Sequence, residues 1–451
     1  MSGRATRLQL LTFSTIPMRT FHLAWMAFFV CFFAWFAVAP LMPLIRDELS
    51  LTKDQIANIN IAAVCVTIFV RLIIGPMCDR FGARLTYTWL LAFGAIPVIA
   101  ISFAQSYEAF IFWRLCIGAI GASFVVTQVH TSTMFASNVV GTANATAAGW
   151  GNAGGGATQA LMPLLVTALV SLGVEHSFGW RAALLVPGVL MLIMAVVYYR
   201  YAKDTPDGNL NRAGARLVTG APSKGTDSFI AAARDYRVWM LFITYAACFG
   251  VELTIHNLAA VYYVDRFGLS MTTAGIYVGC FGLLALFARA LGGVLSDRIA
   301  RTRGLDGRVA LLFGLILAEG LGLMAFAEMS IATQAFVAML IFGVFTHMAC
   351  GATYSLVPFV NRRALGGVAG IVGAGGNVGA VAAGFVVKGA TSVQQSLFIL
   401  GGIVTLSALC ALAVRFSREH KAEERRLFQE ALALRDAQTE GVAVTDVAPA
   451  R

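Results

Sequence analysis

Residues 69–80 read F-V-R-L-I-I-G-P-M-C-D-R, and residues 287–298 read F-A-R-A-L-G-G-V-L-S-D-R. Both follow the pattern F-x-R-x-x-x-G-x-x-x-D-R, 218 residues apart. Such self-similarity indicates that one structural unit occurs twice in the chain. The repeat places an arginine inside an apolar segment and an Asp-Arg pair at its end, and these two features guide the interpretation of the whole sequence.

The composition indicates a polytopic helical membrane protein. Of the 451 residues, 58% are hydrophobic and 12% are charged, and the mean hydropathy is +0.76. Apolar runs of about 20 residues, long enough to cross a hydrocarbon core of about 30 Å, recur along the whole chain. The first run, 21–44, is too long for a signal-peptide core and lacks a small-residue cleavage site, so we expect it to be a retained span.

We predict an all-α fold with twelve spans in two pseudo-symmetric halves of six. The expected spans are 21–44, 57–78, 86–104, 108–132, 143–171, 180–199, 237–263, 272–296, 308–327, 333–358, 365–388 and 394–416. Prolines, an Asp-Gly pair and mixed charges mark 200–236 as a linker. The expected organisation is therefore a tail (1–20), a half (21–199), the linker (200–236), a half (237–416) and a charged tail that begins as a solvated helix (417–451).

The basic residues predict the orientation. With the N-terminus in the cytoplasm, 25 of the 33 lysines and arginines fall in cytoplasmic segments and five fall outside. The remaining three, Arg71, Arg114 and Arg289, lie within spans. This bias predicts that both termini are cytoplasmic. It also accounts for the net charge of +10 without a nucleic-acid partner.

Glycine-rich segments form a second repeat. G-W-G-N-A-G (149–154) matches A-G-G-N-V-G (374–379), 225 residues later, in the fifth and eleventh expected spans. Glycine lets helix backbones approach closely in lipid. We expect two smooth helix faces near the substrate, made by Gly149, Gly151, Gly154, Gly155, Gly156, Gly373, Gly375, Gly376 and Gly379. Asn152 and Asn377 are the polar groups on these faces, suited to contact a ligand or to orient the arginines; for the glycines, helix packing alone is the alternative.

The Asp-Arg pairs predict a gate at the cytoplasmic end. The residues of this gate motif are Gly75, Asp79, Arg80, Gly82 and Arg84 after the second span, and Gly293, Asp297 and Arg298 after the eighth. An aspartate at this place can cap or pair across the interface between the halves, while glycine permits close helix contact. Two repeated six-span halves with such a gate are typical of a secondary transporter whose site lies at the membrane midplane.

Two arginines predict an anion site at that depth. Arg71 and Arg289 each lie eight residues before the gate aspartate, which is about 12 Å at 1.5 Å per residue. A cation held there costs several kcal/mol and is functional by default. We expect Glu252 to be the only acid at the midplane, so positive charge remains for a bound anion. Guanidinium groups suit planar oxyanions, and carboxylate, phosphate, sulfate and nitrate all remain open.

Taken together, these motifs resemble the nitrate/nitrite porter family of the major facilitator superfamily. The paired glycine-rich segments are similar to that family's nitrate signatures, and the F-x-R repeats, Y-A-A-C-F-G-V-E-L-T in span 7 and D-T-P-D-G-N at 204–209 fit the same family. The resemblance implies that nitrate, and nitrite as a second candidate, is the substrate. It also implies that the substrate-binding residues are Arg71, Arg289, Asn152, Asn377, Tyr245, Phe124 and Phe249, with the three rings sandwiching the planar ion.

The energy source is the remaining question. Anion uptake into a cell that is negative inside works against about 2.3 kcal/mol per charge per 100 mV, so it needs a co-transported proton or an exchanged anion. Glu252, His256 and His347 are the candidates for the proton carrier. G-V-E-L-T-I-H-N resembles the proton-coupled branch, although that branch commonly has an acid where this chain has His256. We therefore expect proton symport, with nitrate/nitrite exchange as the alternative.

Other classes of function find less support. Neither clustered metal ligands nor a nucleophile set occurs, and the eight cysteines form no CxxC pair, so we expect no cofactor, no metal and no enzymatic activity. A transporter of a small carboxylate is the second candidate, and a sensor that has lost turnover is a third. We expect a protein of the bacterial inner membrane that works as a monomer.

Overall fold

A computed structural model describes residues 3–210, 225–269 and 271–439. This part of the chain is helical, with two isolated β-bridges and no strand. The helices are α1 (Ile16–Phe36), η1 (Ala39–Leu41), α2 (Met42–Leu49), α3 (Lys53–Phe81), α4 (Ala83–Ala100), η2 (Ile101–Phe103), α5 (Tyr107–Ile117), η3 (Gly118–Ala122), α6 (Ser123–Met134), α7 (Val140–Ser171), α8 (His176–Tyr201), α10 (Gly225–Ala233), α11 (Tyr236–Phe267), α12 (Met271–Leu283), α13 (Ala285–Glu328), α14 (Ala332–Val360), η4 (Arg362–Ala364), α15 (Leu365–Gly389), α16 (Val393–Leu412) and α17 (Arg418–Thr439).

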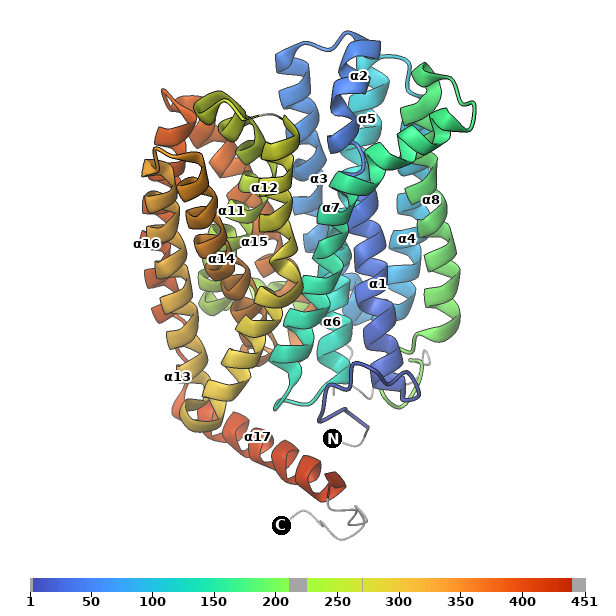
Figure 1. Cartoon of the computed structure of the whole chain (residues 1–451). Helices are drawn as coiled ribbons and strands as arrows, with labels where there is room; N and C mark the ends of the chain where they lie inside the picture. Colours follow the sequence, from blue (N-terminus) through green and yellow to red (C-terminus); the bar gives the residue numbers. More distant parts are fainter. Residues whose placement is uncertain (1–2, 211–224, 270, 440–451) are drawn as a thin grey trace.

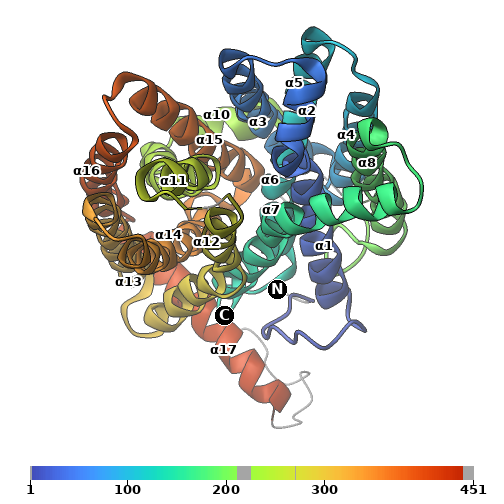
Figure 2. The same ribbon diagram turned by 45° about the horizontal axis from the view of Figure 1, so that its top comes forward.

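The helices form two bundles that lie side by side. One bundle contains α1 to α8 and the other contains α10 to α16 (Figures 1 and 2). Both chain ends lie at the same end of the molecule, below which α17 extends (Figure 1). We call this end the terminal end. The two bundles meet mainly where α3 packs on α15 and where α7 packs on α13 and α14.

The described residues contain ten helices long and apolar enough to cross a membrane. The count is eleven if the bent pair Val140–Gln159 and Leu161–Ser171 is one span. One of the ten, Thr273–Glu328, is 56 residues long and would measure about 84 Å if it were straight. It is instead broken at Gly304, whose φ of 58° is in the left-handed region. The expected spans 272–296 and 308–327 lie on either side of this break.

The expected linker and tails are only partly described, because 211–224 and 440–451 lie outside the described residues. Within the linker, α10 is a helix whose Ser228 and Ala232 are buried, so this part packs against α3 and α15 and is not solvated. The charged tail begins as the helix α17, which is exposed on one side and has Glu424, Phe428 and Ala431 buried on the other. Lys421 of this helix pairs with Asp306 at 2.7 Å, and Glu424 pairs with Arg362 at 2.5 Å.

The repeated aspartates cap helices of the opposite bundle at the terminal end. Asp79 of α3 accepts hydrogen bonds from the backbone N–H of Gly366 in α15, at 3.1 Å, and from Ser228 Oγ, at 2.5 Å. Asp297 of α13 accepts from the backbone N–H and hydroxyl of Thr142 in α7, at 2.6 and 2.7 Å. A carboxylate at a helix N-terminus satisfies free N–H groups and the helix dipole. We call these two contacts the latch.

Glycines bring the helices of the latch into backbone contact. A methyl group added to Gly75 would meet the carbonyl group of Gly366, and one added to Gly293 would meet the carbonyl group of Gly141 at 2.5 Å. Gly82 has a different role, because its φ of 85° forms the turn between α3 and α4. Both repeats of the motif therefore join the two bundles with glycine contacts beside an aspartate cap.

The arginines of the motif do not cross between the bundles. Arg80 lies over the ring of Phe81, with 5.0 Å from Cζ to the ring centroid. The backbone N–H of Arg84 donates to Asp204 at 2.9 Å, and Arg298 is exposed at the rim of a cleft at the terminal end. Asp297 is paired instead with Arg308 of its own helix, at 2.7 Å.

The glycine-rich faces pack mostly within their own bundles. Added methyl groups at Gly151 and Gly154 would meet α1, and those at Gly375 and Gly379 would meet backbone oxygens of α11. A methyl group added to Gly155 would lie 3.1 Å from the ring of Phe36, whereas one added to Gly156 would lie 4.0 Å from its nearest neighbour. The remaining three glycines lie beside residues of the expected site. Gly149 lies beside Arg289, Gly373 beside Arg71, and Gly376 beside Tyr245 and Phe249.

We predict that Gly293→Val lowers the melting temperature of the purified protein in detergent. The added side chain would clash with Gly141 and Ala145 of α7, and overpacking of this kind costs about 1–3 kcal/mol. Gly314→Val, in the same helix α13, is the matched control because nothing lies within 4 Å of its Cβ position. Equal melting temperatures for the two variants would contradict a tight contact at the latch.

Candidate functional site

Arg71 is fully buried and has no acidic partner among the described residues. Its side chain is 0% exposed. Nε and Nη2 donate to the carbonyl oxygen of Gly121, at 3.2 and 3.0 Å, and Nη1 donates to the carbonyl oxygen of Gly373 in the other bundle. In the described part of the chain it forms no ion pair. Neutral oxygen acceptors therefore orient this guanidinium group without neutralising it.

Arg289 is the counterpart of Arg71 in the second bundle, but it has an acidic partner. It is equally buried and pairs with Glu252 of α11. Its Nε is buried without a hydrogen-bond partner of normal geometry, and so is the hydroxyl of Tyr245, which interacts with the same guanidinium group. Buried donors are rarely left unpaired, because each costs about 1–3 kcal/mol. The site thus holds two donors that an anion could satisfy.

Each asparagine contacts the buried arginine of the opposite bundle, Asn377 directly and Asn152 through Glu252. Asn377 of α15 faces Arg71, and its amide oxygen, turned toward the guanidinium, accepts from Nη1 and Nε at 3.1 Å each. Asn152 of α7 donates to Glu252, which in turn pairs with Arg289. The geometry is compatible with the orienting role considered for these residues. Both contacts join α1–α8 to α10–α16 through a buried polar link.

Four aromatic rings surround the arginines. Phe249 lies between them, with its centroid 5.3 Å from Cζ of Arg71 and 5.5 Å from Cζ of Arg289. Tyr245, one turn earlier, is parallel to Phe249 within 5°, and Phe124 of α6 is parallel to Tyr245 within 12°. Tyr354 of α14 meets Phe124 edge-on at 4.6 Å. The two guanidinium groups therefore lie close together among these rings.

These rings do not leave space for a planar ion between their faces in this conformation. The centroid of Phe124 is 5.7 Å from that of Tyr245 and 6.2 Å from that of Phe249. Two van der Waals layers need about 7 Å. The sandwich that the family resemblance implies therefore requires Phe124, from the first bundle, to move away from the two rings of the second.

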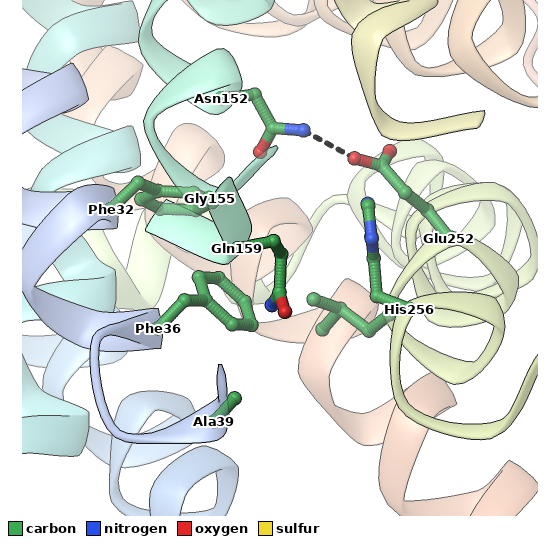
Figure 3. Close-up of a pocket in the computed structure, with 9 residues that line it drawn as sticks. Phe32, Phe36, Ala39, Asn152, Gly155, Gln159, Glu252 and His256 are labelled. Atoms are coloured by element: carbon green, nitrogen blue, oxygen red, sulfur yellow. Dashed lines mark hydrogen bonds between the residues drawn. The ribbon is translucent and has the colours of Figure 1, made fainter. Parts of the chain in front are cut away.

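A small pocket approaches the site from the end opposite the termini. It is lined by residues of α1 and η1, by Glu252, Leu253 and His256 of α11, and by Asn152, Gly155 and Gln159 of α7 (Figure 3). In Figure 3 Asn152 and Glu252 meet across it, and His256 projects from the same helix as Glu252. Of the expected proton carriers, Glu252 and His256 therefore line a cavity.

His347 lies on the other side of Glu252 and is fully buried. Its Nδ1 is 3.4 Å from a carboxylate oxygen of Glu252, and its Nε2 is 3.2 Å from the carbonyl oxygen of Phe281. The ring can donate from Nε2 to this carbonyl oxygen or from Nδ1 to Glu252, depending on which nitrogen carries the hydrogen. A ring that donates to both acceptors carries a hydrogen on each nitrogen, one of them beside Glu252.

The expectation that Glu252 is the only midplane acid is wrong. Glu319 lies within the expected span 308–327, and its side chain is completely buried. One acid among many apolar residues hardly changes the mean hydropathy of a span, so the hydropathy pattern does not reveal Glu319. Glu319 does not contact either arginine, so Arg71 keeps its uncompensated charge.

Tyr354 was also missed, although the internal repeat contains a signal for it. Residues 121–124 read G-A-S-F and residues 351–354 read G-A-T-Y. Comparison of the two halves at this offset of 230 residues would have placed Tyr354 opposite Phe124. Both rings lie at the site, one from each bundle.

Comparisons with known proteins agree with this architecture. The model of the Major Facilitator Superfamily matches residues 24–361. Among solved structures, the proton:xylose symporter XylE has a TM-score of 0.65 at 13% identity and covers 89% of this chain and 96% of its own. The transporter FucP, in the outward conformation, also has a TM-score of 0.65, at 14% identity, covering 89% of this chain and 100% of its own. At such identities these likenesses show the fold alone.

Sequence relatives are more specific. "High affinity nitrate transporter 2.5" of Arabidopsis thaliana is 38% identical over 416 residues, covering 91% of this chain and 82% of that protein. "High-affinity nitrate transporter 2.3" of Oryza sativa subsp. japonica is 40% identical over 386 residues, covering 84% and 73%. "Nitrate/nitrite transporter NrtP" of Nostoc punctiforme is 28% identical over 469 residues, covering 88% and 91%. This chain is a multi-pass membrane transporter and not an enzyme, and it belongs to the nitrate/nitrite porter family of the major facilitator superfamily.

Proposed function

We propose that this protein takes up nitrate by alternating access, with the anion bound between Arg71 and Arg289. The names of its relatives support nitrate as the substrate. The observation that carries the proposal is the charge of Arg71, which has no acidic partner among the described residues, beside two buried donors that lack a hydrogen bond of normal geometry, Arg289 Nε and the Tyr245 hydroxyl. Nitrite, a smaller planar anion, is the second candidate substrate, and a small carboxylate is a more distant alternative.

The planar shape of nitrate suits this set of donors. Guanidinium groups present paired N–H donors in one plane, which match two oxygens of a planar anion. The flat faces of Phe124, Tyr245 and Phe249 favour a flat ligand over a tetrahedral one. Phosphate and sulfate would need donors above and below the plane, where the rings offer none.

The accompanying topology is part of the proposal. We propose twelve crossings, with Thr273–Glu328 divided at Gly304 and the bent α7 counted once. Both termini and the latch then face the cytoplasm, with halves at 21–199 and 237–416 joined by 200–236, and with tails at 1–20 and 417–451. The bias of basic residues supports this orientation. We place the protein in a bacterial inner membrane, and since one chain supplies the whole site, a monomer suffices.

We propose that proton symport drives uptake. Glu252 pairs with Arg289, and its carboxylate also lies 3.4 Å from Nδ1 of His347, where a proton can be shared. A nitrate ion that binds Arg289 competes with Glu252 for the guanidinium group, which frees the carboxylate to take up a proton. Obligate nitrate/nitrite exchange is the alternative, because an empty site with an unpaired arginine resists reorientation.

The two-arginine site predicts that Arg71→Lys and Arg289→Lys each nearly abolish nitrate uptake. A lysine keeps the charge but cannot replace the planar fork of donors. Arg114→Lys is the matched control, because Arg114 is buried in the same bundle as Arg71 but donates to the carbonyl oxygen of Trp35. The measurement is uptake of labelled nitrate into cells at equal protein levels. Wild-type affinity in both Arg71→Lys and Arg289→Lys would contradict the proposed site.

Proton symport predicts that nitrate enters liposomes that contain no internal substrate. With the wild-type protein reconstituted and the outside made acidic, labelled nitrate should accumulate, and a protonophore should abolish the accumulation. Entry that starts only after nitrite or nitrate is loaded inside would reject symport and establish exchange.

A further inference from the structure

Glu319 is a buried acid that the proposed binding site does not use. It lies in the second part of α13, and its side chain is 0% exposed. Glu319 and Arg289 are each 15 residues from the break at Gly304, so both lie about 22 Å from the terminal end at 1.5 Å per residue. An ionisable side chain at this depth is a candidate functional residue.

Glu319 has no cationic partner among the described residues. Both of its carboxyl oxygens are buried without a hydrogen-bond partner that meets normal geometry in the described part of the chain. An unpaired carboxylate in the interior costs several kcal/mol. This distinguishes Glu319 from Glu252, whose carboxylate interacts with Arg289, Asn152 and His347.

Among the described residues, one hydroxyl group interacts with the side chain of Glu319. The side chain of Glu319 interacts with the hydroxyl of Thr346 in α14. That hydroxyl also lies 3.1 Å from the carbonyl oxygen of Phe342, and its one hydrogen can be donated either to that oxygen or to Glu319. An ionised carboxylate takes this hydrogen away from Phe342, whereas a protonated carboxyl donates its own hydrogen to the hydroxyl and leaves the bond to Phe342 in place.

Few charged groups face Glu319 from the neighbouring helices. On α11, Glu252 is a second negative group within electrostatic range of Glu319. On α14 the residue after Thr346 is His347, which contacts Glu252. α16 approaches at Gly320 through Gly401 and Thr405, and its sequence contains no lysine, arginine, histidine, aspartate or glutamate. In the part of the chain that the structure describes, no lysine or arginine of these helices forms an ion pair or a hydrogen bond with Glu319.

We propose that Glu319 is a second proton-binding site of the transport cycle, connected through α14 to the His347–Glu252 pair. The inference rests on the proposed symport. A proton from the external solution forms an O–H bond with the carboxylate of Glu319 before the site closes, and the same bond breaks when the proton leaves to the cytoplasm. Closure around an ionised, unpaired Glu319 is unfavourable, so the closed state forms only with the proton bound.

The test separates proton coupling from nitrate binding in the same liposomes. Exchange of labelled nitrate against internal nitrate needs the anion site but no net proton movement. Net accumulation driven by an imposed pH gradient needs both. For Glu319→Gln, which keeps the shape but cannot titrate, we expect exchange at the wild-type rate and net accumulation reduced to the level of protein-free liposomes.

Glu328→Gln is the matched control, because Glu328 ends the same helix but is exposed. It should keep both activities. Proton-driven accumulation by Glu319→Gln at the wild-type level would overturn the proposal for Glu319 while leaving the nitrate site intact. Failure of the wild-type protein itself to accumulate nitrate would instead reject the symport on which the proposal rests.

A second variant covers the case in which Glu319→Gln does not fold or loses exchange as well. Glu319→Asp keeps a titratable group on a shorter side chain, farther from Thr346. We expect it to retain proton-driven accumulation with a shifted dependence on external pH. An accumulation profile identical to wild type across the pH range would overturn the proposal.

Discussion

Two guanidinium groups buried at one place, with one carboxylate within reach, are the constraint on which this structure depends. Arg289 is paired with Glu252, whereas Arg71 is held by carbonyl and amide oxygens alone. A buried ion pair is costly to assemble and more costly to break, so Glu252 cannot be shared freely between the two arginines. The remaining charge gives an anion its binding energy, and it also makes the empty site unfavourable in a closed protein.

The same groups link binding to movement of the two bundles. The asparagine links and the stack of Phe124 on Tyr245 and Phe249 all join α1–α8 to α10–α16 at the level of the arginines. The latch joins the same bundles at the terminal end through Asp79 and Asp297. Because the stacked rings are too close to admit a planar ion, access to the site requires the bundles to separate. This is the behaviour expected of alternating access around a central site.

Much of this arrangement could be predicted from the sequence because it is repeated. The duplicated motif identified both arginines and both latch aspartates, and the second repeat identified Asn152 and Asn377. Pairing was harder to predict, since contacts such as that of Glu252 with Arg289 join helices far apart in the chain and depend on how the helices rotate. The burial of Glu319 was missed because one acid hardly changes the hydropathy of a span, and neither repeat includes it.

The central claim is that an anion binds directly between the two arginines. The most direct measurement is an experimental structure of the wild-type protein with and without nitrate, determined in the same lipid and buffer. The account predicts planar density within hydrogen-bond distance of Arg71 and Arg289, bordered by Phe124 and Phe249, and present only with nitrate. Nitrate density elsewhere in the protein, with Arg71 still bound to Gly121, Gly373 and Asn377 alone, would contradict the account.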